Sequence, residues 1–137
     1  MKKKATVWIL PIVLFGFAAV VYAASNVIPQ MLTKFEAEGA KDFSAAKGEA
    51  FWHKKHTPAE GGPQRSCTTC HGTDLKKAGS HQRTGKVIEA MAPSVNAERF
   101  TDEAKIEKWF LRNCKWTIGR ECTAQEKGDV LTYLGAQ

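Results

Sequence analysis

The chain has 137 residues, a formal net charge of +6, and 43% hydrophobic residues, so it can bury one small core. Its basic residues are scattered and form no stripe interleaved with aromatic residues, which argues against a nucleic-acid-binding protein. Four cysteines occur in so short a chain, and their spacing carries most of the functional information.

The N-terminus has the pattern of an export segment. Three lysines at positions 2–4 precede an apolar run over residues 5–24, with a small-x-small cleavage pattern ending at Ala23. Two outcomes are open: residues 1–23 form a cleaved signal peptide, or they remain as a helix anchored in the inner membrane. Either outcome exports the rest of the chain, which predicts a periplasmic location, with or without membrane attachment through the apolar run.

Two helices are predicted near the ends of the exported part. The first begins near Phe43 and carries Gly48 on the same stripe as two aromatic residues. The second begins at a capping box, Thr123 with Glu126, and carries Gly128 among apolar residues at helical spacing. A glycine inside a helix costs about 1 kcal/mol against alanine, so we expect both glycines at a close helix crossing.

The segment Cys67-Thr68-Thr69-Cys70-His71 is a Cys-x-x-Cys-His run, the attachment signature of a c-type haem. This spacing lets one turn of backbone hold both thiols against the vinyl groups of one porphyrin edge, while the imidazole reaches the iron as proximal ligand. The alternatives are half of a zinc site, which needs a second ligand pair, and a thioredoxin-like dithiol, which needs a βαβ context. The motif therefore predicts one covalent haem c bound through Cys67 and Cys70, with His71 on the iron.

Residues 72–85 contain three glycines and no sustained apolar period, which predicts a loop. The following run, residues 87–93, is too short to argue for a sheet, and Pro93 bars an internal strand. We expect this run to lie over an edge of the haem.

A third helix is predicted after Thr101 as its cap. Its apolar stripe consists of Ile106, Trp109, Phe110 and, as the odd member, Asn113. A buried amide must find a hydrogen bond or a metal, because leaving it unpaired costs on the order of 1 to 3 kcal/mol. Asn113 is therefore a candidate ligand for the second axial position of the iron.

The residue pattern alone leaves that distal ligand open. Met91 follows the haem motif by 20 residues, and three histidines outside the motif would give a bis-histidine iron: His53, His56 and His81. A methionine or histidine ligand would make the protein a low-spin electron shuttle. Asn113 would make it a binder of diatomic ligands, because amides bind iron weakly.

Several segments beside the haem motif resemble the high-spin class I cytochromes c of the sphaeroides haem protein (SHP) type. They are residues 85–96, 99–102, 107–110, 112–114, 119–123 and 125–129, of which Arg-Asn-Cys and Gly-Arg-Glu-Cys are the most specific. The resemblance implies an all-α class I cytochrome c fold over residues 43–137, with residues 24–42 as an N-terminal extension. It also implies Asn113 as the distal ligand and a disulfide between Cys114 and Cys122. These are the two cysteines that remain after the haem motif, and an even number of cysteines in an exported protein agrees with a disulfide.

The same resemblance implies a function. Asn113 is expected to leave the iron on reduction, which opens the ferrous iron to oxygen, nitric oxide or carbon monoxide, and a dihaem cytochrome c is expected to deliver the electrons. No constellation of catalytic acid, base or nucleophile appears beyond the haem motif. The sequence therefore indicates an electron-transfer and ligand-binding protein more than a dedicated enzyme.

Overall fold

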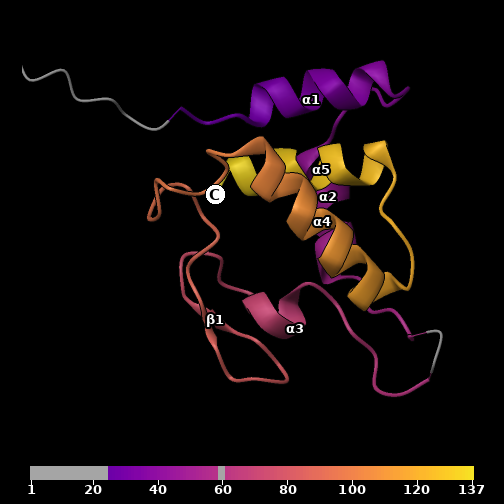
Figure 1. Cartoon of the computed structure of the whole chain (residues 1–137), viewed down its shortest axis with the longest axis vertical. Helices are drawn as coiled ribbons and strands as arrows, with labels where there is room; N and C mark the ends of the chain where they lie inside the picture. Colours follow the sequence, from indigo (N-terminus) through magenta and orange to yellow (C-terminus); the bar gives the residue numbers. More distant parts are fainter. Residues whose placement is uncertain (1–24, 59–60) are drawn as a thin grey trace, which may run out of the picture.

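The computed structural model describes residues 25–58 and 61–137, and the predicted signal or anchor segment lies outside them. The elements in chain order are α1 (Ile28–Ala37), α2 (Ala45–His53), α3 (Thr68–His71), β1 (Gly79–Ser80), β2 (Val87–Ile88), α4 (Glu103–Ile118) and α5 (Ala124–Gly135) (Figure 1). The predicted all-α architecture is confirmed. The sequence predicts no sheet, but within the described residues β1 and β2 form a small antiparallel sheet with two residues in each strand. None of the helices in these two described ranges is long and apolar enough to cross a membrane.

Helices α2 and α5 approach each other closely because of glycine, as predicted. A Cβ atom on Gly48 would lie 2.0 Å from the carbonyl oxygen of Asp129, which is backbone of α5. A Cβ atom on Gly128 would lie 2.1 Å from the ring of Phe43, just before α2. The two glycines therefore admit different neighbours, one a helix backbone and the other an aromatic ring.

One of the two predicted helix caps is confirmed, and the other lies one residue further along the chain. The capping box of Thr123 and Glu126 is present at the start of α5, and Ser44 caps α2 by accepting a hydrogen bond from the Lys47 amide. The cap of α4 is Asp102, and the prediction of Thr101 is wrong by one residue. Asp102 has an extended backbone and its carboxylate accepts the Lys105 N–H at 2.9 Å, a stronger acceptor for this position than a hydroxyl.

Helix α1 lies within the stretch interpreted as an extension and contributes to the core. Met31 and Phe35 are fully buried, packed with Ile106 and Leu131 from α4 and α5. The Val27 amide donates to the Phe100 carbonyl at 2.8 Å, which fixes the start of the helix. The domain boundary at residue 43 itself stays a prediction.

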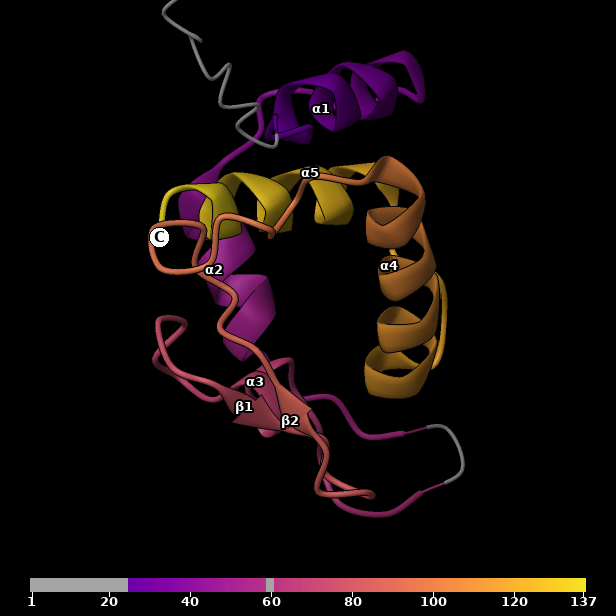
Figure 2. The ribbon, with the colours of Figure 1, turned by 60° about the vertical axis from the view of Figure 1, so that its left-hand side comes forward.

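A second cluster joins α2 to α5 on the side of the haem motif. It buries Trp52, Leu75, Ala92, Val130, Tyr133 and Leu134. Phe100 and Phe110 pack against both clusters and so connect the two halves of the core. In Figure 2, α2 and α4 extend from opposite ends of α5, with α3 beyond the end of α2. Helices α2 and α5 therefore position α3 and α4 on different sides of the molecule's centre.

We predict that Gly48→Ala lowers the free energy of unfolding by roughly 2 to 3 kcal/mol, because the added methyl group meets rigid backbone. Gly135→Ala is the matched control, since its Cβ would meet only the mobile end of the Ile28 side chain, at 2.8 Å. The control should stay within about 0.5 kcal/mol of the wild type. Urea denaturation of the haem-loaded proteins measures both, and equal effects of the two substitutions would contradict a close crossing at Gly48.

Candidate functional site

The Cys-x-x-Cys-His motif forms a single helical turn. Cys67 is the N-terminal cap of α3, and Gly72, at φ +72°, ends the helix directly after His71. The Ser66 amide donates to the Thr69 hydroxyl at 2.9 Å, which fixes the chain as it enters the turn. The two thiols and the imidazole are thus held on one short, capped piece of backbone, as the attachment of one haem edge requires.

The imidazole of His71 is neutral and partly buried. Its Nδ1 atom is buried and has no hydrogen-bonding partner among the described residues, so no hydrogen bond from them fixes which ring nitrogen carries the proton. Burial, and secondarily the charge of Arg99, lowers the pKa of His71 to about 4. The Trp52 ring packs against it, with ring centroids 5.2 Å apart. At neutral pH the ring nitrogen is therefore available as a metal ligand without a proton to displace.

The two cysteines of the motif do not form a disulfide or a metal cluster. Burial raises the pKa of Cys67 to about 12, so its thiol is protonated at neutral pH and is no thiolate nucleophile. Within the described ranges, no group of three or more His, Cys, Asp or Glu side chains is placed to hold a metal ion. This arrangement favours thioether attachment over the zinc and redox-dithiol alternatives.

Sequence reasoning missed Gly79, which supports the motif from the other side. A Cβ atom at this position would lie 2.1 Å from the Cys70 carbonyl oxygen and 2.8 Å from the His71 Cα. The Gln82 amide in the same hairpin lies 3.5 Å from the Cys70 sulfur. The three glycines in residues 72–85 look alike in sequence, but Gly79 closely approaches the haem-motif backbone, whereas Gly85 faces open space and serves a turn at φ +66°.

Residues 89–92 form a strap that is tied on both sides. The amides of Met91 and Ala92 both donate to the Leu75 carbonyl at 2.9 Å. On the other side, the Arg99 guanidinium donates to the Ala90 carbonyl at 2.7 Å and to the Glu89 carbonyl. Met91 is therefore held next to Leu75, four residues after His71.

Asn113 lies on α4, but at the surface of the polypeptide. Ile106 is buried and Phe110 is half-buried, whereas Asn113 and Trp109 are exposed, so the expectation of one buried stripe holds for only part of it. The helix rotates this edge of the stripe away from the core formed with α1 and α5. The side-chain amide of Asn113 has no hydrogen-bonding partner in the part of the chain that the structure describes.

Two tryptophans flank Asn113 on the same face of α4. Trp109 is 46% exposed and Trp116 is 38% exposed, which is a large apolar surface for a small domain and indicates a site that something else covers. The Arg65 guanidinium lies 4.5 Å from the Trp116 ring and donates to the Trp116 carbonyl at 3.1 Å. This contact ties the end of α4 to the residue two positions before Cys67.

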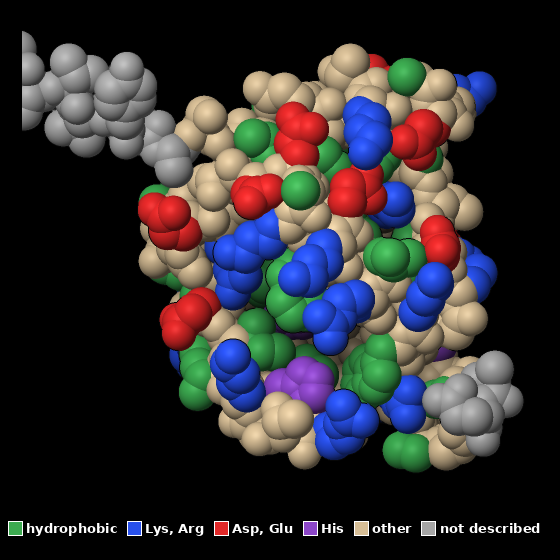
Figure 3. Space-filling model, in the orientation of Figure 1, with side chains coloured by type: hydrophobic (Ala, Val, Ile, Leu, Met, Phe, Trp, Pro, Cys, Tyr) green, Lys and Arg blue, Asp and Glu red, His purple; other side chains and the backbone are tan. Residues whose placement is uncertain are grey.

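A space-filling view shows the same face from outside. Hydrophobic side chains gather over α4 and α3, surrounded by Lys and Arg side chains and with a histidine among them (Figure 3). Acidic side chains lie mostly in the upper part of this view, toward the end of the molecule where α1 lies. The candidate site is thus an apolar surface with a positive rim.

The other candidate ligands lie in different surroundings. His53 is exposed at the end of α2, and His81 is exposed in the β1–β2 turn, where its Nδ1 lies 3.0 Å from the Thr84 hydroxyl. His56 packs against the Phe51 ring, and its Nε2 is buried without a partner among the described residues. Burial, with help from Lys54, lowers the pKa of His56. Of the three, only His56 has a buried nitrogen that lacks a partner.

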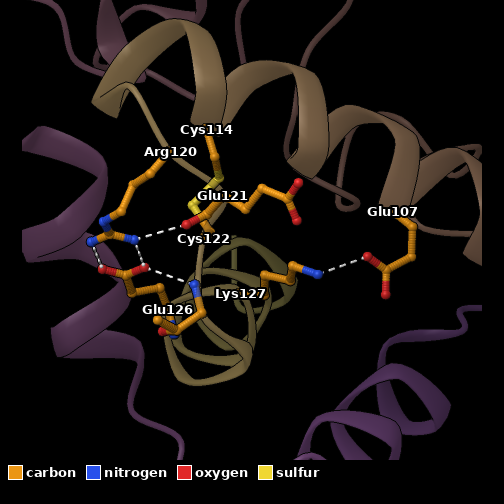
Figure 4. Close-up of a disulfide and its surroundings, with 8 residues drawn as sticks. Glu107, Cys114, Arg120, Glu121, Cys122, Glu126 and Lys127 are labelled. Carbon is orange, nitrogen blue, oxygen red and sulfur yellow. Dashed lines mark hydrogen bonds and ion pairs between the residues drawn. A yellow bond between two sulfur atoms is a disulfide. The ribbon is translucent and has the colours of Figure 1, made fainter. Parts of the chain in front are cut away.

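Cys114 and Cys122 form a disulfide in the structure, with Cα atoms 5.6 Å apart (Figure 4). It joins α4, one residue after Asn113, to the segment that leads into α5. Beside it, the Arg120 guanidinium makes a two-pronged ion pair with Glu126, both contacts at 2.7 Å, which is the main cause of the lowered Glu126 pKa. Across the same region Lys127 and Glu107 pair at 2.9 Å. The disulfide therefore fixes the C-terminal half of α4, and the Lys127–Glu107 ion pair joins its N-terminal half to α5.

The residues present fit a covalently bound haem. Two cysteines and a neutral histidine share one helical turn, and α4 offers exposed aromatic surface and a free amide. Two of the three buried polar atoms without partners in the described residues, Trp52 Nε1 and His71 Nδ1, lie beside this turn. Each of these features provides either attachment, apolar cover or hydrogen bonding for such a group.

Comparison with known proteins gives consistent matches. A family model described as a domain of unknown function (DUF1924) matches residues 38–134. The cytochrome c-type protein SHP of Cereibacter sphaeroides is 46% identical over 109 residues, which cover 79% of this chain and 82% of that protein. The cytochrome c'' of Methylophilus methylotrophus is 33% identical over 115 residues, which cover 83% of this chain and 75% of that protein.

Solved structures agree with these matches. The structure of oxidised SHP, described as an oxygen binding cytochrome c, has a TM-score of 0.71 at 45% identity and covers 80% of this chain and 96% of that chain. Oxidised cytochrome c'' has a TM-score of 0.70 at 29% identity, over 80% of this chain and 94% of that chain. A solution structure of cytochrome c'', described as giving insights into haem-ligand detachment, has a TM-score of 0.69.

We predict that the exported protein contains the Cys114–Cys122 bond and that replacing both cysteines by serine lowers the free energy of unfolding. The chain-entropy model gives about 2.5 kcal/mol for a closed loop of about nine residues. Mass spectrometry with alkylation before and after reduction detects the bond, and thermal denaturation measures its effect. Alkylation of two thiols under native, non-reducing conditions would show that the bond is absent.

Proposed function

Because this chain belongs to the SHP-type cytochromes c, and is therefore a monohaem c-type cytochrome, we propose that it takes electrons from a redox partner and binds a diatomic ligand at its reduced haem. The ligand would be oxygen, nitric oxide or carbon monoxide. Asn113 would hold the distal side of the ferric haem and would release it on reduction. The observation that carries this proposal is the free amide of Asn113 between two exposed tryptophans on α4.

Cys67 and Cys70 are the residues proposed to form the two thioether bonds, and His71 is the proposed proximal ligand. The haem, when bound, supplies an iron that changes oxidation state and can accept an axial ligand on each face. His71 supports this role because its low pKa keeps the ring free of a second proton at neutral pH. Gly79 supports it by allowing the hairpin to rest on the backbone of Cys70 and His71.

The chemistry of the Asn113 amide suits a reversible ligand. An amide oxygen is a hard, weak donor that prefers ferric to ferrous iron, so reduction favours its release. Fixing α4 through Arg65 and the disulfide leaves only a local side-chain movement to open the site. The released NH₂ group can then donate a hydrogen bond to a bound diatomic ligand. That cytochrome c'' is described in terms of haem-ligand detachment supports a mobile distal ligand in such folds.

The second candidate function is a low-spin electron shuttle with Met91 or a histidine as distal ligand. His56 gives this candidate its best observation, since its Nε2 is buried without a partner in the described chain. Met91 supports it less, because the strap that holds it is tied to Leu75, next to the proximal ligand. Both candidates agree with electron delivery to the haem.

The proposed partner is a dihaem cytochrome c, on the resemblance to the SHP type. The proposed location is the periplasm, because the N-terminus has the pattern of an export segment. If the signal stays uncleaved, residues 5–24 would attach the protein to the inner membrane. We propose no dedicated enzymatic activity.

Covalent attachment is testable by extraction. Acidic acetone should leave the haem with the wild-type protein, because two thioether bonds hold it, while the double variant Cys67→Ala with Cys70→Ala should lose it to the organic layer. Absorbance of the two phases gives the result. Haem in the organic layer from the wild-type protein would contradict attachment at these cysteines.

The distal ligand is tested by comparing Asn113→Ala with Met91→Leu. We expect Asn113→Ala to change the ferric visible spectrum and to raise the oxygen dissociation rate of the ferrous form about tenfold, the effect of losing one hydrogen bond of roughly 1.4 kcal/mol. Carbon monoxide, a weaker hydrogen-bond acceptor, should be affected less, and Met91→Leu should change neither. Stopped-flow and visible spectroscopy measure these quantities. An unchanged Asn113→Ala protein, with a Met91 variant that loses a low-spin ferrous spectrum, would replace the first function by the second.

A further inference from the structure

A single side chain links helix α4 to the segment that carries the haem motif. The Arg65 guanidinium carbon lies 4.5 Å from the centre of the Trp116 ring, and its Nη1 donates to the Trp116 carbonyl at 3.1 Å. Within the two described ranges, no other hydrogen bond or ion pair connects α4 with residues 54–92. In Figure 2 the C-terminal end of α4 lies beside the chain that leads into α3. Arg65 therefore provides the polar link between these two parts of the molecule.

The contact also completes the end of a helix. Helix α4 ends at Ile118, and Gly119, at φ +77°, terminates it. The Trp116 carbonyl is one of the last four, which a regular helix leaves without a partner. A guanidinium that donates to such a carbonyl interacts favourably with the negative end of the helix dipole, and its planar group stacks on the indole ring. One side chain thus holds both the backbone and the ring of Trp116.

The backbone around Arg65 is itself fixed. It pairs with the backbone of His56 through two hydrogen bonds of 2.8 Å, which close the loop between them. Cys67, the first proposed point of haem attachment, follows two residues later, and the Ser66 amide between them donates to the Thr69 hydroxyl at 2.9 Å. The guanidinium therefore holds α4 at a defined position relative to the haem motif.

Trp116 lies on the same face of α4 as Asn113. The two residues are three positions apart, so they are neighbours on the helix surface, about 4.5 Å apart along its axis. The disulfide and the Lys127–Glu107 ion pair connect α4 to α5 and to the segment before it, not to the haem motif. The contact with Arg65 is therefore the polar contact that relates this part of α4 to the haem motif.

We infer that Arg65 is a positioning residue for the distal ligand: by holding Trp116, it keeps Asn113 within reach of the ferric iron. An amide is a weak ligand, so its hold on the iron depends on a backbone that already lies at the right distance. Without the link, the end of α4 can move away from the haem motif, and the fraction of ferric protein with Asn113 bound falls. This inference rests on the proposed function, in which Asn113 is the distal ligand.

Imidazole binding to the ferric, haem-loaded protein tests the inference, because imidazole must displace Asn113. We expect Arg65→Gln to bind imidazole about tenfold more tightly than the wild type, which corresponds to about 1.4 kcal/mol. Arg65→Lys keeps the charge but loses the planar stack, so its increase should be smaller. Arg120→Gln is the matched control, because Arg120 follows α4 directly but pairs with Glu126, and it should leave the affinity unchanged.

A double-mutant cycle separates positioning of Asn113 from a general effect on the fold. Asn113→Ala alone should raise the imidazole affinity, and adding Arg65→Gln should then have no further effect, because no ligand remains to be positioned. Equal increases with and without Asn113 would overturn the inference, as would an unchanged affinity in Arg65→Gln. If Asn113→Ala itself leaves imidazole binding unchanged, the proposed function fails and the inference fails with it.

Hydrogen exchange supplies a readout that does not depend on the iron. Amides in the last turn of α4 should exchange about tenfold faster in Arg65→Gln, because the helix end loses its partner, and should not change in Arg120→Gln. Equal exchange in Arg65→Gln and the wild type would overturn the inference. Should Arg65→Gln fail to fold, Trp116→Leu removes the stacked ring and should raise the imidazole affinity only while Asn113 is present. An increase that persists in Asn113→Ala would overturn the inference.

Discussion

The contact of α2 with the backbone of α5, which only a glycine at position 48 permits, sets the geometry on which the rest of the structure depends. It places Trp52 of α2 between Tyr133 of α5 and the imidazole of His71. The haem motif itself is a single turn, too short to be stable alone, so its position is inherited from the helices around it. A side chain added at position 48 would displace α2, and with it Trp52, and would therefore change the position of the His71 imidazole.

The opposite side of the site is fixed by different means. Helix α4 is bound to the entrance of α5 by a disulfide and is joined to the haem-motif segment by the contact of Arg65 with Trp116. Asn113 directly precedes the first of these fixed points, and its side chain has no partner of its own among the described residues, while its backbone is held in the helix. A rigid helix with a free, weakly binding side chain is the arrangement that a reversible ligand requires, because release then costs no rearrangement of the fold.

The sequence predicted features whose cause is local. The Cys-x-x-Cys-His turn, the capping box of Thr123 and Glu126 and the glycine crossing each depend on a few neighbouring residues, and the structure has all three as structural features. It did not predict features that arise from packing of distant segments. Gly79 differs from Gly85 in the backbone that it touches, and the core role of Phe35 depends on Ile106 and Leu131, which are 71 and 96 positions further along the chain. The contacts of Arg99 are with the backbone carbonyls of Glu89 and Ala90, which no residue pattern around Arg99 indicates. The exposure of Asn113 was missed because helical periodicity gives a stripe but not which edge of it the core covers.

We propose that reduction leaves the iron open on the α4 side. The most direct measurement is the visible spectrum of the dithionite-reduced protein before and after addition of carbon monoxide. Release of Asn113 on reduction predicts a high-spin ferrous spectrum that carbon monoxide converts into that of a six-coordinate adduct. Sharp, split low-spin ferrous bands that carbon monoxide leaves unchanged would contradict it, because they would show that a strong protein ligand stays on the reduced iron.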